Sequence, residues 1–253
     1  MSLQQKAHEK KFETGLREFI ETAPGIFLSG VSIDTVIFSF HNDTLKVLLL
    51  RFGHTPYFSL PGGFIKKEEN LDDAALRILQ ERTGLENIYL EQFYTAGNTI
   101  RSRDSIIHDT LKKFTGGLPS NNWLEQRFIS VCYYALVDET KVAPQTEPFV
   151  TEFKWIDVNK IPKLLYDHKL IVTKAQTRLQ ADLDEKLIGF NLMNETFTMA
   201  ELQSLYEAVY QKKFVRTNFQ RKMLSLNVLD RLDKQYNGKA HKAPYLYRFV
   251  KSK

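Results

Sequence analysis

Apolar residues recur at helical spacing near the start of the chain and at strand spacing directly after it. The first pattern predicts a helix over residues 5–21, which the punctuation Ala23-Pro24-Gly25 would end. Residues 31–40 and 45–51 are then rich in β-branched and aromatic side chains, and the polar turn 41–44 separates them. We therefore expect these two runs to form a hairpin.

The middle of the chain mixes predicted helices and strands. A long polar stretch over residues 97–126 interrupts this order, and we expect it to be a functional loop or to carry a short helix near 106–114. The remaining expected elements are a helix over 71–83 that stops at Gly84, strands at 88–95, 128–137 and 153–156, and helices at 158–166 and 168–187.

The pattern restarts after Leu187 and indicates a separate C-terminal unit. Thr198 and Glu201 have the spacing of a capping box, which predicts the start of a helix that runs to about residue 211. A second helix at 215–225, strands at 227–232 and 245–250, and a hairpin tip at 235–242 that contains Asn237-Gly238 follow. Helix, turn, helix and hairpin is the order of a winged helix-turn-helix.

The charge distribution also separates the two parts. Residues 189–253 hold 12 basic and 5 acidic residues, a net charge of +7, whereas residues 1–188 have a net charge of −2. Such an asymmetry is compatible with a polyanionic partner and equally with a solvated basic surface, and the charge alone does not decide between them.

Composition excludes several classes of protein. With 18 Phe and 11 Tyr among 253 residues the chain has ample apolar area for a core, so global disorder is excluded. The single cysteine, Cys132, rules out an intramolecular disulfide scaffold and favours a cytoplasmic location, and we expect it to be a small buried hydrophobe. No apolar stretch approaches the ~20 residues of a membrane span. The six histidines show no metal-ligand spacing, so no structural zinc is expected.

The segment 63–85, GFIKKEENLDDAALRILQERTGL, carries the main chemical motif. It resembles the Nudix box, with the motif glycines at Gly63 and Gly84, five residues between Gly63 and Glu69, and seven residues between Glu69 and Arg77. In the family, Glu69 and Arg77 would pair to hold the loop against the helix. The resemblance implies an α/β/α sandwich with a mixed sheet.

The positions that would bind metal depart from the family pattern. The resemblance puts three carboxylates at the positions of Ile78, Glu81 and Arg82, where only Glu81 is acidic. An arginine at such a position repels a divalent cation. We therefore expect no catalytic residues, no metal and no cofactor. Mg²⁺ would be needed only if the chain were instead an active Nudix hydrolase of an ADP-ribose-like nucleotide, with Glu68, Asp72 or Asp73 as substitute ligands.

A degenerate Nudix box followed by a winged helix is similar to the Nudix-related transcriptional regulators of bacteria. This resemblance implies a regulator with operator DNA and a small-molecule effector as partners, and operator symmetry implies a homodimer. The segments 72–75, 84–87 and 188–210 look most like the sugar-responsive branch, so the expected effector is a pentose, with an ADP-ribose-like nucleotide as the alternative. The expected domains are an N-terminal helical extension (1–27), the effector domain (28–167), a connecting helix (168–187) and an α+β DNA-binding domain (188–253).

Candidate binding residues follow from these assignments. In the helix 215–225, Val215, Phe219, Met223 and Leu226 share one stripe that should be core, which leaves the polar residues for DNA, where Gln and Arg read base edges. The expected DNA-binding residues are Arg216, Thr217, Asn218, Gln220 and Arg221 on the helix, with Lys239, His241 and Lys242 at the hairpin tip. After the strand 88–95, Arg101, Arg103 and Asp104 are candidates for lining an effector pocket or for an exposed loop.

Overall fold

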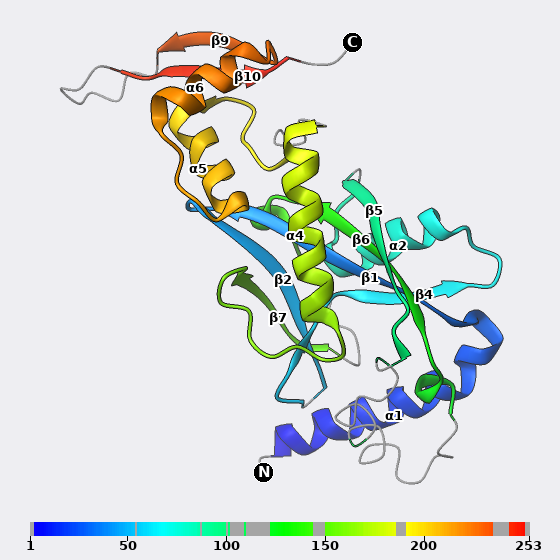
Figure 1. The fold of residues 1–253 in the computed structure, drawn as a ribbon. Coiled ribbons are helices and arrows are strands. Elements are labelled where there is room, and N and C mark those ends of the chain that lie inside the picture. The colour runs from blue at the N-terminus through cyan, green and yellow to red at the C-terminus, as the bar shows by residue number, and fades with distance from the viewer. Residues whose placement is uncertain are drawn as a thin grey trace.

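The structure is a computed structural model that describes residues 3–53, 55–86, 88–99, 101, 109, 122–143, 150–185, 191–234 and 243–250. It consists of a larger α/β unit and a smaller C-terminal unit that extends from one end of it (Figure 1). The predicted winged-helix tip 235–242 and the predicted helix near 106–114 fall almost entirely outside these residues.

A seven-stranded mixed sheet forms the centre of the larger unit. Its main path runs β3-β2-β1-β6-β5, while β4 pairs with β1 and β7 pairs with β2. Among the strand pairs that the structure describes, β1 and β6 are the parallel pair, with Asp34 opposite Cys132. The strands are β1 (Phe27–His41), β2 (Thr44–Phe52), β3 (Phe58–Ser59), β4 (Gly62–Lys66), β5 (Tyr89–Ala96), β6 (Ile129–Leu136) and β7 (Val150–Asp157).

The predicted hairpin of β1 and β2 is confirmed. Asn42 and Asp43 both take positive φ angles, 49° and 56°, which matches the twist that a two-residue hairpin turn requires. The burial of β1 side chains alternates along the strand, because neighbouring side chains of a strand point to opposite faces of the sheet. Val36 and Phe38 join the core on one face of β1, whereas Ile33 and Ile37 join cores on the other.

Two helices cover the two faces of this sheet. Helix α2 (Leu71–Thr83) buries Ala74, Ala75, Ile78 and Leu79 on one face. Helix α4 (His168–Glu185) buries Ile171, Ala175 and Leu179 on the other, where it crosses the sheet and reaches the C-terminal unit (Figure 1). The resulting α/β/α arrangement is the fold class expected from the sequence.

Two expectations about helices were wrong. Helix α1 (Leu3–Ile26) continues through Ala23, Pro24 and Gly25 instead of ending there, because Ala23 is fully buried and its packing outweighs the helix-breaking residues. Residues 158–166 form no helix. Their backbone instead bonds β3, with Leu165 N–H donating to the Phe58 carbonyl at 2.8 Å, and Pro162 disfavours a helix there.

The C-terminal unit has the predicted winged helix-turn-helix order. Helices α5 (Met199–Tyr210) and α6 (Arg216–Ser225) pack on a three-stranded sheet with the order β8-β10-β9. Thr198 and Glu201 form the predicted capping box. The strands are β8 (Phe197–Thr198), β9 (Leu229–Lys234) and β10 (Tyr245–Phe249).

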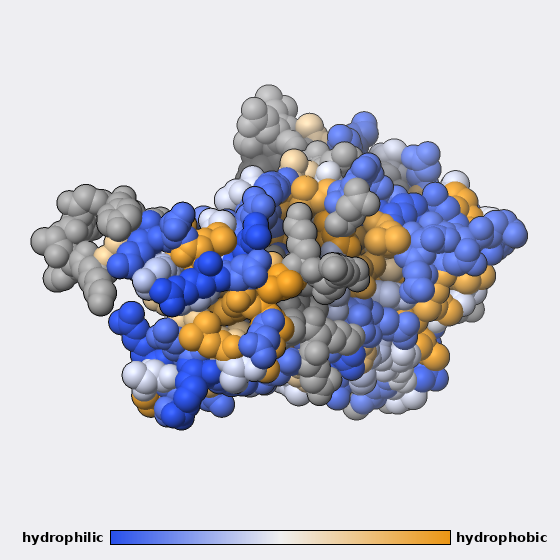
Figure 2. Space-filling model, turned by 90° about the horizontal axis from the view of Figure 1, so that it is seen from above, coloured by the Kyte–Doolittle hydropathy of each residue, from blue (hydrophilic) through white to orange (hydrophobic). Residues whose placement is uncertain are grey.

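The predicted core stripe of α6 is half right. Phe219 and Met223 are buried, at 3% and 0% exposure, but Val215 is 65% exposed and Leu226 is 38% exposed. Both lie at the ends of the helix, where Val215 is the N-cap and Leu226 the C-cap, so neither faces the α5 side as the interior residues do. Viewed from the side of the C-terminal unit, the molecule shows a mainly hydrophilic surface with apolar patches among the hydrophilic residues (Figure 2).

Candidate functional site

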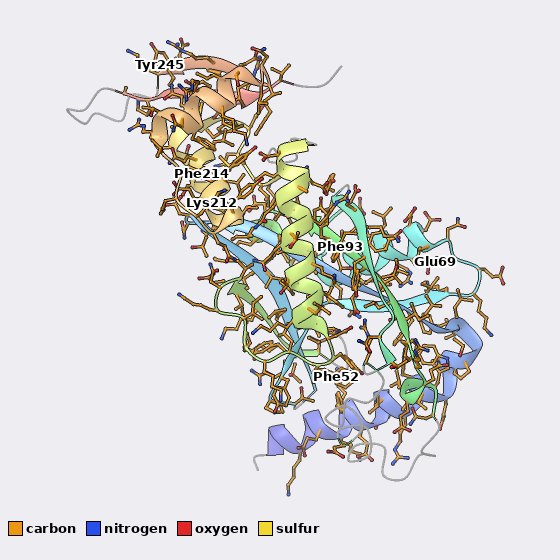
Figure 3. All side chains as sticks on the ribbon, viewed as in Figure 1. Phe52, Glu69, Phe93, Lys212, Phe214 and Tyr245 are labelled. Atoms are coloured by element: carbon orange, nitrogen blue, oxygen red, sulfur yellow. The ribbon has the colours of Figure 1, made fainter. Side chains whose placement is uncertain are left out.

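The Nudix-like segment begins with a loop that one ion pair holds in place. Arg77 on α2 binds Glu69 through two hydrogen bonds, Nε to Oε1 at 2.6 Å and Nη2 to Oε2 at 2.8 Å. The Glu69 carboxylate also accepts the Lys66 N–H, and the hydrogen bond from Arg77 holds the pKa of Glu69 below its usual range. Figure 3 places Glu69 at the loop between β4 and α2. This is the loop-to-helix role expected for the pair.

The three positions that correspond to the family's metal-binding carboxylates have other partners, including Glu81, the one carboxylate expected to survive. Ile78 is buried against Gly63, and a side chain at residue 63 would place its Cβ only 2.9 Å from Ile78. Both oxygens of Glu81 accept from Arg77 Nη1 at 3.1 Å. Arg82 donates to the Gly62 carbonyl, from Nη2 at 2.9 Å.

The substitute carboxylates also have separate partners. Asp72 accepts a hydrogen bond from the Tyr133 hydroxyl at 2.6 Å, and Asp73 accepts one from Asn70 at 2.9 Å. Within the described ranges no group of three His, Cys, Asp or Glu side chains is arranged to hold a metal ion. The residues present therefore do not form the carboxylate cluster that Mg²⁺ hydrolysis by this fold would require.

A cavity of about 620 Å³ opens beside this segment, between β1, β4, α1 and the start of α4. Its volume lies within the range of small-molecule sites. Its charged lining contains the basic side chains of Lys66, Arg77, Arg82 and Arg101 and the carboxylates of Asp34, Glu81 and Glu125. Two of these carboxylates, Asp34 and Glu81, are paired with arginines.

A buried ionic group forms the inner wall of the cavity. Arg101 Nη2 donates to Asp34, Arg101 Nη1 lies 3.4 Å from Asp167 Oδ1, and His168 Nε2 lies 3.6 Å from the second Asp34 oxygen. The Leu60 N–H donates to His168 Nδ1 at 2.9 Å, which leaves the imidazole proton on Nε2, facing Asp34. Burial acts to raise the pKa of Asp34, but His168 and Arg101 outweigh it, so the pKa lies below its usual range.

Three distant parts of the sequence meet at this wall. Asp34 comes from the central strand β1, Arg101 from the stretch after β5, and His168 from the first residue of α4. Arg101 thus lines the cavity, as one of the two sequence interpretations proposed, while Arg103 and Asp104 lie outside the described residues. Sequence reasoning missed Asp34 and His168. The available signal was Asp34 itself, a lone carboxylate inside the apolar run VSIDTVIFSF.

The candidate DNA-binding surface lies on α6. Arg216, Thr217, Asn218 and Arg221 are exposed, and Gln220 is partly exposed. Arg221 Nη2 lies 3.2 Å from Asn218 Oδ1, so these two side chains share one side of the helix. Lys239, His241 and Lys242 lie outside the described residues.

Helix α4 connects the cavity to this surface. Its first residue, His168, lines the cavity, and 16 residues later Asp184 accepts hydrogen bonds from the Tyr210 hydroxyl at 2.7 Å and from Lys222 Nζ at 3.0 Å. Tyr210 ends α5 and Lys222 belongs to α6. Gln180 of α4 also donates to the Val209 carbonyl at 2.9 Å. In Figure 3, Lys212 and Phe214 lie beside this junction, where the C-terminal unit meets the rest of the chain.

Comparisons with known proteins agree with both units. Residues 30–175 match the model of the NUDIX domain, and residues 189–249 match the model of the NrtR DNA-binding winged helix domain. The chain belongs to the Nudix family. With an NrtR-type winged helix after its Nudix domain, it is a DNA-binding transcriptional regulator. None of the helices in the described ranges is both long and apolar enough to cross a membrane.

Individual relatives share this two-part organisation. The protein described as "ADPR responsive transcriptional repressor NtrR" from Acinetobacter baylyi is 29% identical over 227 residues, which cover 87% of this chain and 82% of the relative. The crystal structure of Shewanella oneidensis NrtR complexed with a 27mer DNA is 27% identical, with a TM-score of 0.61, covering 87% of this chain and 93% of that one. The structure of the same protein without DNA gives a TM-score of 0.63 at 27% identity, covering 88% and 94%.

Proposed function

We propose that this chain is an operator-binding regulator whose effector is a nucleotide of the ADP-ribose class. The observation that carries the proposal is the path of α4, which begins in the wall of the 620 Å³ cavity and ends in direct contact with α6. An effector with different affinities for two conformations of this wall would shift the protein towards one of them, and α4 would transmit the shift to α6. Coupling of this kind is reciprocal, so operator DNA would change effector affinity by the same factor.

The cavity supports a phosphorylated effector over the free pentose expected from the sequence. Basic side chains line it, and charge-assisted hydrogen bonds from arginine suit phosphate oxygens. A free pentose is uncharged and would leave most of this volume unfilled. The name of the Acinetobacter baylyi relative points to the same effector class, which was the alternative in the sequence interpretation. A homodimer stays a prediction.

We further propose that the effector is bound without being hydrolysed. The support is the pairing of Glu81 with Arg77, the burial of Ile78 and the hydrogen bond from Arg82 to the Gly62 carbonyl. These contacts leave the segment without the clustered carboxylates that bind a divalent cation. The Nudix fold is then a sensor.

The side chains on the exposed face of α6 would contact the base edges of the operator. The proposed contacts are those of Arg216, Thr217, Asn218, Gln220 and Arg221, because these side chains surround the end of the helix that enters a major groove in helix-turn-helix proteins. The tip residues Lys239, His241 and Lys242 remain proposed phosphate contacts.

The experiment is an effector titration against DNA. Operator fragments are selected with the full-length protein from a randomised duplex library, and their binding is followed by fluorescence anisotropy at fixed salt, because salt changes every protein–DNA affinity. ADP-ribose is expected to change the operator Kd at least fivefold, while ribose and arabinose leave it unchanged. An effect of a free pentose without an effect of ADP-ribose would overturn the effector assignment.

A further inference from the structure

One part of the cavity lining is built from aromatic rings. Phe19, Phe27, Phe64 and Phe128 all line the cavity and are each partly exposed. They surround Trp123, which is 9% exposed and lies 4.7 Å from Phe64, centroid to centroid. The rings also contact one another, with Phe64 5.8 Å from Phe19 and 5.2 Å from Phe128.

Helix α1 supplies one side of this aromatic wall. Leu16 and Phe19 line the cavity, while Phe12 and Ile20 of the same helix are buried beside Leu16 and do not line the cavity themselves. Phe12 packs edge-on against Phe52 at 5.6 Å and closely against Gly53, where a Cβ would lie 2.7 Å from the ring. Figure 3 shows Phe52 facing α1 from the end of the sheet. The helix is therefore docked by one set of side chains and presents another to the cavity.

The cavity lining combines two kinds of chemistry. Partly exposed aromatic rings are costly in water and favourable against a planar π system, and the same lining carries Lys66, Arg77 and Arg82. Arg77 Nη2 donates to the Phe64 carbonyl at 2.9 Å, so this basic side chain lies beside the aromatic residues. A ligand that matches both has a flat heteroaromatic ring joined to an anionic group. This is the chemistry of a nucleotide, which has a base to stack and phosphates to pair.

We infer that α1 is part of the effector site, and that Phe19 and Phe64 stack against the base of the bound nucleotide. This inference rests on the proposed function and adds the residues that select a nucleotide over a sugar phosphate. It also gives the N-terminal helix a role in recognition. The basic side chains of the same lining bind the diphosphate.

The test measures binding of ADP-ribose to the full chain by isothermal titration calorimetry. Phe19→Leu and Phe64→Leu are each expected to weaken binding about tenfold, within the range that base–aromatic stacking provides. Phe19→Tyr keeps the ring and is expected to stay within threefold of the wild type. Phe12→Leu is the matched control on the same helix, because Phe12 is buried outside the cavity. It is expected to lower the melting temperature without changing the Kd.

A second readout separates stacking from simple packing. The fluorescence of 1,N6-etheno-ADP-ribose is expected to be quenched on binding to the wild type and to recover in the bound state of both leucine variants. Unchanged affinity and unchanged quenching in folded Phe19→Leu and Phe64→Leu would overturn the inference while leaving the proposed function intact. If the wild type does not bind ADP-ribose at all, the proposed function itself fails, and this inference fails with it.

Discussion

Replacing Arg101 with methionine tests the cavity wall most directly. Arg101 and Asp34 are 7% and 9% exposed at their side chains, so the substitution leaves a buried carboxylate without its arginine partner, with His168 and Ser130 still beside it. Breaking a buried ion pair in this way costs about 3–5 kcal/mol. Methionine preserves much of the side-chain volume, so the loss comes mainly from the unpaired charge.

The same variant is expected to change how stability depends on pH. In the wild type the folded-state pKa of Asp34 lies below its ordinary value of 3.8. Ionised Asp34 therefore stabilises the folded protein at neutral pH, and this stabilisation is lost only as the pH falls through the folded-state pKa. Without Arg101 the burial of Asp34 acts to raise that pKa. The variant then recovers part of its deficit as pH falls from 7.5 towards 5, because protonation relieves the buried charge.

The assay is urea denaturation of both proteins at pH 7.5 and pH 5.0, followed by circular dichroism. The control is Arg17→Met, which breaks a surface pair with Glu13 whose side chains are 40% and 46% exposed, and which is expected to cost less than about 1 kcal/mol. The double variant Asp34→Asn/Arg101→Met is expected to be more stable than Arg101→Met alone at pH 7.5. A loss below about 1 kcal/mol for Arg101→Met, or a deficit that does not shrink at pH 5.0, would refute the reasoning.

Four further outcomes are expected. The protein with Mg²⁺ or Mn²⁺ should hydrolyse ADP-ribose far more slowly than ~1 s⁻¹, and turnover near that rate that disappears in Glu81→Gln would contradict the sensor assignment. Arg221→Ala should weaken operator binding by about 1–3 kcal/mol but spare non-specific binding; wild-type affinity for all DNA in a folded variant would make Arg221 ordinary surface. Asp184→Asn should change the operator affinity measured without effector by less than about threefold, because both side chains of its ion pair with Lys222 are partly exposed to solvent. The same variant should reduce the change in operator affinity that ADP-ribose causes, and an undiminished change would exclude the contact between α4 and α6 as the coupling path. Phe219→Ala should cost roughly 3–5 kcal/mol of stability in thermal unfolding, and a native melting temperature would show that Phe219 is not core.

Local patterns in the sequence determined most of the secondary structure and the division into two units. The helix 71–83 with its stop at Gly84, the β1–β2 hairpin and the Thr198/Glu201 capping box all depend on residues close together in the chain. The pairing of Glu69 with Arg77 was also predictable, because a motif of fixed spacing places them on a loop and the helix that follows it.

Contacts between distant segments decided the rest. The path of residues 158–166 depends on backbone hydrogen bonds to Phe58, about 100 residues earlier, which no local pattern contains. The burial of Ala23 similarly carries α1 through Pro24. The cavity wall needs residues from positions 34, 101 and 168 to meet, because only tertiary packing excludes the water that would otherwise solvate their charges. The sequence therefore determined most of the elements and that a Nudix unit joins a DNA-binding unit, while the tertiary structure decided where the candidate effector cavity lies and that α4 links it to α6.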